Sequence, residues 1–153
     1  MLACVSGSGF AVALALLAGL AGSIQIAVMG RFGDRIGSLE ALAFSLLVST
    51  VIATAALVAL RGSLDGFATA VRQPPWLWLG GVMGFFIVFT ITVAQPRIGT
   101  TATIGLLIAG QLAMGALIDR FGLFGVERID LTLPRLLGIA LLAVGAALSL
   151  HRA

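Results

Sequence analysis

Charged residues are scarce in this sequence. Only 10% of its 153 residues are charged, whereas 60% are hydrophobic, and the mean hydropathy is +1.17. A chain of this length cannot hide so much apolar surface in a soluble core, where polar residues would have to cover the outside. Most of the surface is therefore expected to face lipid.

Residue types that perform catalysis are equally rare. The single cysteine, Cys4, excludes an internal disulfide, and the single histidine is His151, close to the end of the sequence. No charged residue falls deep inside a hydrophobic run, and no metal-ligand cluster or nucleophile–base pair is recognisable. We therefore expect no enzymatic activity, no metal and no cofactor.

The charge that is present is basic, with a net charge of +3 and a pI of about 11.1. A nucleic-acid-binding surface would need basic residues concentrated in a stripe with interleaved aromatics. Here every arginine falls in a connector or at the end of a hydrophobic run. The composition therefore indicates topology and headgroup residues and excludes nucleic acid as a partner.

Five long uncharged runs are each predicted to cross the membrane. About 20 apolar residues at a rise of 1.5 Å span a hydrocarbon core roughly 30 Å thick. The runs show no alternation, and tyrosine, typical of barrel girdles, is absent. The sequence thus predicts an all-α polytopic protein forming one transmembrane domain over residues 1–153, with spans at about 10–29, 41–60, 76–95, 98–118 and 134–150.

The fifth run and two of the connectors need comment. The run Leu136 to Leu150 covers only about 22 Å at helical rise, so Arg135 and Arg152 are expected to lengthen it by reaching the interface. Residues 30–37 are predicted to form a tight glycine-rich link. Residues 63–72 are predicted to form a short interfacial helix, because apolar side chains recur on one face at Leu64, Phe67, Ala68 and Val71.

The arginines divide almost evenly between the two membrane faces. With five spans, the face of the N-terminus carries five and the opposite face carries four, namely Arg31, Arg35, Arg97 and Arg152. The orientation of a membrane protein follows the number of basic residues in its short loops. A difference of one arginine between the two faces therefore favours one orientation only weakly. Either both orientations are made from one gene, or the balance is chance in a small protein.

Small residues predict where helices pack. Helices in lipid associate by close backbone approach and by interhelical hydrogen bonds. Spacings of four residues within the spans nominate six packing positions: Gly19, Ser23, Gly80, Gly84, Gly115 and Gly145.

Neutral polar residues within the spans are the candidates for a binding site. Gln111 lies about three residues past the middle of the fourth span and follows a threonine-rich entry that includes Thr103. Gln25 lies toward the end of the first span. An amide in hydrocarbon needs a partner, because leaving it unpaired costs a few kcal/mol. Two readings stay open, in which these amides either join helices at about 0.6 kcal/mol per bond or line a cavity near the midplane.

Asp119 shares a helical face with Gln111 and Gly115, at intervals of four residues. It stands at the C-terminal end of its predicted helix, where the macrodipole disfavours a carboxylate. Two explanations remain open. Asp119 either has a functional role, or has a local one as a partner of Arg120 or Arg128 in a wet connector or as a turn residue before Gly122.

Several short motifs follow one another along the chain. They are Gln25, then Trp76-x-Trp78-x-Gly80-Gly81-x-x-Gly84-Phe85-Phe86, Gly110-Gln111-Leu112, Asp119-x-Phe121-Gly122-x-Phe124-Gly125 and Arg135-x-x-Gly138. Their order resembles the YdcZ-type branch of the drug/metabolite transporter superfamily over roughly residues 10 to 150. Two positions depart from the family pattern. Met29 stands where an asparagine is usual, four residues after the glutamine, and Ser49 stands where a glycine is common.

The resemblance implies a five-helix protein of the bacterial inner membrane, in a branch whose single genes, gene pairs and fusions place two halves antiparallel. We therefore expect half of an inverted two-protomer transporter that exports a small organic solute by alternating access. Its partner is a second copy or a paralogous five-span chain. Gln111 and Gln25 would bind the solute against an apolar wall of Phe85, Phe86 and Phe89. The alternative is a channel-like or accessory subunit that requires a partner chain.

Overall fold

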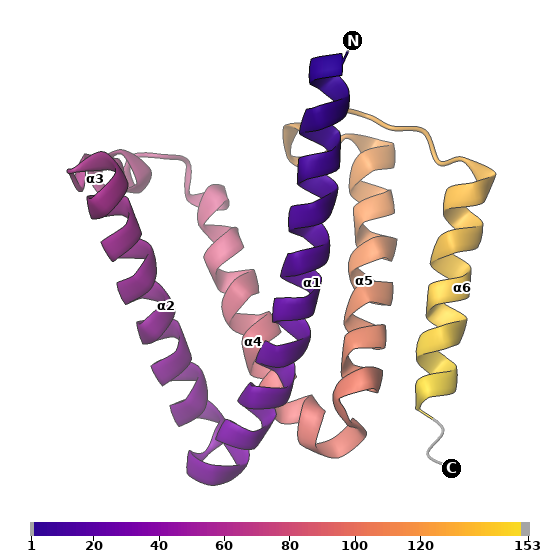
Figure 1. The fold of residues 1–153 in the computed structure, drawn as a ribbon, viewed down its shortest axis with the longest axis horizontal. Coiled ribbons are helices and arrows are strands. Elements are labelled where there is room, and N and C mark those ends of the chain that lie inside the picture. Colours follow the sequence, from indigo (N-terminus) through magenta and orange to yellow (C-terminus); the bar gives the residue numbers. More distant parts are fainter. Residues whose placement is uncertain (1, 151–153) are drawn as a thin grey trace. The chain divides into compact units, whose positions relative to one another are not determined.

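The computed structural model describes residues 2–150, with side chains from residue 9 onward, and this part of the chain is helical without strands. His151 and Arg152 and the side chain of Cys4 lie outside the described residues. The elements, shown in Figure 1, are α1 (Leu2–Ile36), α2 (Ser38–Arg61), α3 (Asp65–Val71), a 3₁₀ turn (Pro75–Trp78), α4 (Leu79–Ile98), α5 (Thr100–Phe121), a second 3₁₀ turn (Leu123–Gly125) and α6 (Leu133–Ser149).

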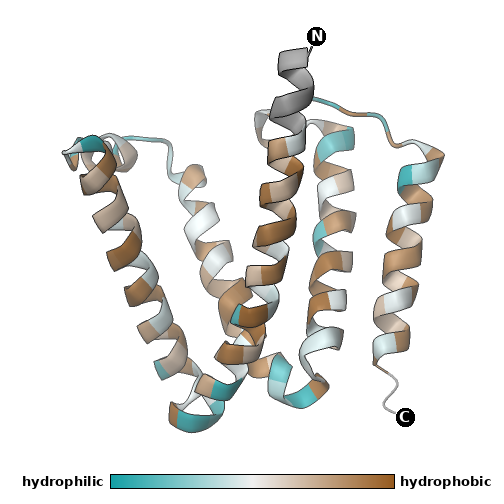
Figure 2. Ribbon diagram, in the orientation of Figure 1, coloured by the Kyte–Doolittle hydropathy of each residue, from teal (hydrophilic) through white to brown (hydrophobic). Residues whose placement is uncertain are grey.

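Four helical segments are long and apolar enough to cross a membrane. They are Gly9–Ile36, Ser38–Arg61, Pro75–Ile98 and Thr100–Phe121. Figure 2 shows hydrophobic colour along these helices and hydrophilic colour gathered at their ends. The all-helical membrane class predicted from composition is thereby confirmed. α6 is apolar but has only 17 residues.

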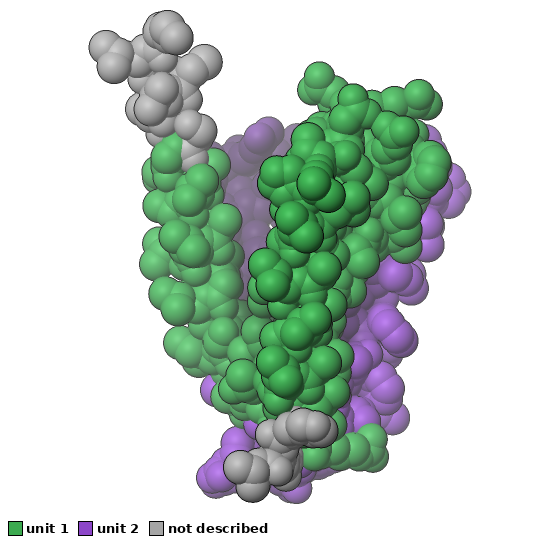
Figure 3. All heavy atoms as spheres, turned by 90° about the vertical axis from the view of Figure 1, so that its right-hand side faces the viewer, with its two compact units in different colours: residues 1–27, 97–153 green, residues 28–96 purple. Residues whose placement is uncertain are grey.

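The contacts divide the chain into two compact units, coloured separately in Figure 3. Unit 1 comprises residues 1–27 and 97–153, and unit 2 comprises residues 28–96. Helix α1 contributes to both units. Each unit has its own close helix contacts.

In unit 2, the end of α1 differs from the predicted connector at residues 30–37. The helix continues to Ile36, and only Gly37 separates it from α2. The glycines in this stretch serve helix packing. A Cβ on Gly33 would come within 2.5 Å of the Cγ2 of Thr92 on α4, and one on Gly30 would collide with the Gln95 side chain. The sequence alone predicts a link here, because glycines that allow helix packing cannot be told from glycines of a turn until their spatial neighbours are known.

The remaining part of unit 2 contains the predicted amphipathic segment. A helix forms there as α3, and all of its residues are exposed. The indole Nε1 of Trp78 donates a 3.5 Å hydrogen bond to the carbonyl of Ala70, which ties the 3₁₀ turn back to α3. Its location at a membrane interface stays a prediction.

In unit 1, α5 and α6 form an antiparallel helical hairpin. Gly105, near the start of α5, meets Ala146 near the end of α6, where an added Cβ would lie 3.0 Å from the Ala146 Cβ. At the other end, Asp119 of α5 pairs with Arg135 of α6. The two helices therefore run side by side along most of their length.

Two one-residue junctions carry unusual backbone angles. Gly37 has φ 101° and ψ 146°, and Gly99, between α4 and α5, has φ 84° and ψ 163°. This region of backbone space is accessible almost only to glycine. It allows two helices to meet with a single residue between them.

We predict that Gly99→Ala lowers the free energy of unfolding by about 1–3 kcal/mol, because a Cβ strains the backbone at this positive φ. The measurement is thermal unfolding of the purified protein in detergent. Gly66→Ala in α3 is the matched control, since an added Cβ there meets nothing within 4 Å. Equal stability of the two variants would contradict the junction geometry.

Candidate functional site

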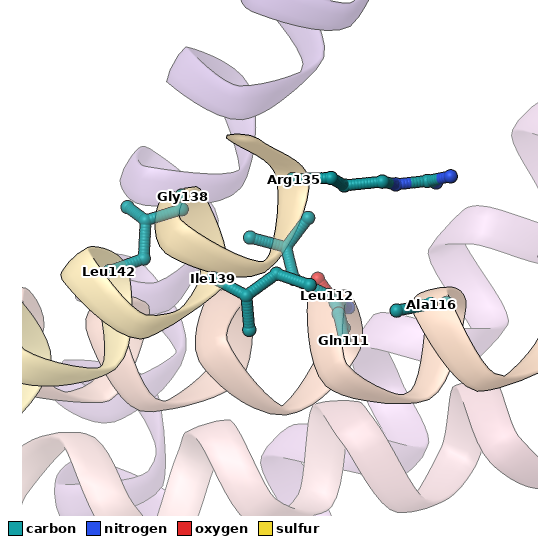
Figure 4. Close-up of a pocket in the computed structure, with 8 residues that line it drawn as sticks. Gln111, Leu112, Ala116, Arg135, Gly138, Ile139 and Leu142 are labelled. Atoms are coloured by element: carbon teal, nitrogen blue, oxygen red, sulfur yellow. The ribbon is translucent and has the colours of Figure 1, made fainter. Parts of the chain in front are cut away.

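An open groove lies between α5 and α6, with a volume of about 300 Å³. This volume is at the lower end of the range for small-molecule sites. Its polar lining is Gln111 and Arg135, shown in Figure 4. Its apolar lining is Leu112, Ala116, Ile139 and Leu142.

Two glycines make this groove hollow. Gly115 on α5 and Gly138 on α6 both line it, and an added Cβ at either position would meet nothing within 4 Å. Close helix contact is made elsewhere in the hairpin, at Gly105 and Ala146. The absence of side chains at these two positions therefore leaves space between helices that are held together beyond it.

Gln111 is exposed, and its amide makes no hydrogen bond to any residue that the structure describes. Several hydroxyls in the spans instead bond a carbonyl of their own helix, as Ser49, Thr50 and Thr92 do. Thr103 is buried, and its hydroxyl donates a 2.8 Å bond to the Gly99 carbonyl. Of these two sequence candidates, Gln111 faces the groove with its amide available, and Thr103 lines neither groove of the hairpin.

Asp119 accepts a hydrogen bond from Nη2 of Arg135 and forms an ion pair with it. The Asp119 side chain is 19% exposed and that of Arg135 is 38% exposed. In Figure 4 the Arg135 side chain extends away from Gln111 and past Ala116, along α5. The polar groups of the groove are therefore the amide of Gln111 at one place and an arginine held by a carboxylate at another.

The local partners proposed for Asp119 are engaged elsewhere. Arg120 forms a 2.6 Å ion pair with Asp130, and Arg128 lies against Gly122, where an added Cβ would come within 2.8 Å of its Cγ. Asp119 therefore pairs with neither of the two arginines considered from the sequence. The segment after α5 instead folds so that a residue 16 positions later reaches the carboxylate.

Helix electrostatics explain why this pair is useful to the fold. Asp119 lies in the last turn of α5, and Arg135 lies in the first turn of α6. The macrodipole disfavours an anion at a helix C-terminus and a cation at an N-terminus. Each charge therefore offsets the unfavourable position of the other. The sequence predicts Arg135 only as a residue that reaches the interface and as part of the Arg135-x-x-Gly138 motif, and the ion pair with Asp119 is a finding of the structure.

A second open groove of about 250 Å³ follows the first along the hairpin. It shares Leu142 with the first groove and includes Gly145 and Ser149. The Ser149 hydroxyl donates a 2.7 Å bond to the carbonyl of Ala146. The second groove therefore presents mostly apolar surface.

The other predicted binding residues lie outside these grooves. Gln25 is exposed on α1 and lines neither. Phe85, Phe86 and Phe89 belong to α4 in the other unit, where Phe85 and Phe89 stack with centroids 6.4 Å apart. A shared site with Gln111 stays a prediction for these four residues.

The predicted packing residues stay predictions as well. An added Cβ at Gly19, Gly80, Gly84, Gly115 or Gly145 would meet nothing within 4 Å in this chain. The Ser23 hydroxyl bonds the Gly19 carbonyl of its own helix at 3.1 Å. None of these five glycines marks a close helix contact within the described chain, and Gly115 and Gly145 line the grooves of the hairpin.

Comparison with known proteins assigns the chain to a family. Residues 10–148 match the family described as "Putative inner membrane exporter, YdcZ". The chain is 32% identical over 142 residues to the inner membrane protein YdcZ of Escherichia coli K12, and the match covers 92% of this chain and 94% of that protein. No solved structure matches. We conclude that this chain belongs to the YdcZ exporter family and is a multi-pass protein of the bacterial inner membrane.

Proposed function

We propose that the protein exports a small organic solute by alternating access, as one half of an antiparallel pair of five-span chains. The groove between α5 and α6 carries this proposal, because it combines space, apolar walls and a few polar groups on membrane-embedded helices. The partner is a second copy of this chain or a paralogous five-span chain.

The fifth span in this proposal is α6. Its 17 residues cover about 26 Å, somewhat less than the hydrocarbon core of about 30 Å. It packs antiparallel along α5, from Asp119 and Arg135 at one end to Gly105 and Ala146 at the other. A helix that follows a membrane-spanning neighbour over this length is supported as a span. Five spans place the two termini on opposite faces.

The antiparallel pair is supported by surface and by charge. Within the chain, the apolar windows of the four long helices are only 11–17% buried, which leaves ample helix surface for a partner. The arginines divide five to four between the faces, so insertion in both orientations meets little opposition. Inverted protomers place a substrate site near the midplane of their interface.

Gln111 suits that position. It is the twelfth residue of α5, which has 22 residues, so an antiparallel axis would bring two copies close to the midplane. Its amide makes no bond to a described residue. This absence of a bond supports a ligand or the second protomer as its partner.

We predict that Gln111→Ala abolishes solute efflux and leaves dimer assembly intact, because the amide serves the ligand. The assay uses proteoliposomes loaded with a mixture of small organic solutes, with efflux measured by mass spectrometry and assembly measured by cross-linking. Met114→Ala is the matched control, since Met114 is exposed on α5 and lines neither groove. Loss of assembly in the Gln111 variant would instead indicate that this residue joins helices.

The same proteoliposomes separate a carrier from a channel. Saturable efflux with counterflow is expected from a carrier made of this chain alone. Non-saturable flux would support a channel, and no flux at all would indicate an accessory subunit that needs a partner chain.

A reporter fused at the C-terminus tests the single-gene version of the pair. Because the arginine balance instructs orientation weakly, we predict activity of an alkaline phosphatase fusion and of a green fluorescent protein fusion in the same host. Adding two arginines to the tail should shift the population toward one orientation. Activity on only one face would rule out the homodimer inserted both ways and leave the paralogous partner.

Asp119 is the proposed coupling residue, because it is the carboxylate bound to the groove arginine. We predict that Asp119→Asn reduces efflux driven by a pH gradient and preserves solute exchange at equal pH, since exchange needs no net ion movement. Unchanged gradient-driven efflux would exclude ion coupling through this carboxylate.

A further inference from the structure

We propose that the groove between α5 and α6 binds an organic carboxylate whose negative group replaces Asp119 on Arg135 and whose apolar body extends toward Gln111. This inference rests on the proposed transport role and names the substrate class of that site. It depends on three features of the groove: the state of Arg135, the arrangement of its polar ends and the nature of its walls.

Arg135 has donors to spare. A guanidinium offers five N–H donors in a planar fork that matches a carboxylate. Among the described residues, the Arg135 guanidinium makes one hydrogen bond, through Nη2 to a single Asp119 oxygen. Its side chain remains 38% exposed beside the open groove. A ligand carboxylate therefore has access to a cation that is charge-paired but not fully hydrogen-bonded.

The polar groups stand at opposite ends of the groove. The Arg135 guanidinium is paired with Asp119. Asp119 lies eight residues along α5 from Gln111, which corresponds to about 12 Å of helix. Leu112, Ala116 and Ile139 supply apolar wall between them. A complementary ligand has an anionic group at one end, an apolar body, and a hydrogen-bonding group at the other.

This arrangement favours a solute over a membrane lipid. An anionic lipid would satisfy Arg135 equally well, but its acyl chain would then lie against the Gln111 amide. A polar group that faces hydrocarbon without a partner is unfavourable. An inorganic anion would leave the apolar walls unused. The geometry points to a soluble organic acid with a second polar group.

In this proposal the Asp119 carboxylate competes with the ligand carboxylate for Arg135. The Asp119 carboxylate is paired with the guanidinium and balances its charge. Binding of a ligand carboxylate exchanges one anion for another at the same cation. Removing the Asp119 charge should therefore strengthen ligand binding. If the ion pair served the fold alone, the same substitution would weaken ligand binding.

The probe is 3-(4-hydroxyphenyl)propanoate, with its neutral amide and with 3-phenylpropanoate as matched analogues. Binding is measured by calorimetry on the full-length protein in phosphatidylcholine nanodiscs. We expect the carboxylate to bind roughly tenfold or more tightly than the amide, because charge-assisted bonds are about twice as strong as neutral ones. This comparison requires no mutation. Equal binding of the acid and the amide would overturn the proposal.

Variants then assign the residues. Arg135→Gln should abolish discrimination between acid and amide, and Arg135→Lys should retain part of it. Asp119→Asn should tighten acid binding several-fold, and weaker binding by a variant that keeps the wild-type unfolding temperature would overturn the competition. Arg120→Gln is the matched control and should change nothing, because it breaks the exposed pair with Asp130 instead.

One further comparison tests the role of Gln111 and whether a lipid, in place of a soluble acid, occupies the groove. Gln111→Ala should weaken the hydroxylated acid several-fold and leave 3-phenylpropanoate unchanged, because only the first carries the far hydroxyl. Loss of acid binding in phosphatidylglycerol nanodiscs, with no effect of Gln111→Ala, would assign the groove to lipid and overturn the proposal. Efflux of neutral or cationic solutes that depends on Gln111, without acid binding, would overturn the substrate class alone. Acid binding without any flux would overturn the transport proposal alone.

Discussion

Hydrocarbon offers no hydrogen bonds to a backbone, so every N–H and C=O inside the bilayer must be satisfied by the chain itself. The helices consequently run without interruption to the residue where the chain reverses. Glycine stands at each such place, either as the whole junction at Gly37 and Gly99 or as the left-handed C-cap at Gly62 and Gly122. Hydroxyls follow the same constraint, since Thr92 bonds the Val88 carbonyl at 2.8 Å and no buried side-chain polar atom among the described residues lacks a partner.

The α5–α6 hairpin differs chemically from this pattern, in which hydroxyls bond carbonyls of their own helix. It holds an exposed amide at Gln111 and a pair of opposite charges at Asp119 and Arg135, each at the helix end that disfavours it. Exposed ion pairs such as Arg120–Asp130 contribute little to stability. A partly buried pair is different, because removing one partner leaves a charge that has lost its compensation. The hairpin therefore links the stability of the fold to the occupancy of the groove arginine.

This link suits a transporter of the YdcZ family. An alternating-access carrier needs a site whose interactions can be exchanged without leaving charges unpaired in a dry environment. A guanidinium shared in turn between a protein carboxylate and a solute carboxylate keeps the cation paired in both states. The glycines at 115 and 138 keep the groove hollow without opening the hairpin, since Gly105 and Ala146 hold it at the far end.

The sequence alone determined the membrane class, the long helices and the family, because hydropathy and helix length are local properties that any window of the chain reveals. It also singled out Gln111 and Asp119, since a polar residue in an apolar run is visible without neighbours. Tertiary structure decided the partner of Asp119, the hollow beside Gln111, and the glycines that allow close approach at Gly30, Gly33 and Gly105. Such features depend on which residue of another helix lies opposite, and that is settled only when the connecting segment folds and brings residue 135 to residue 119.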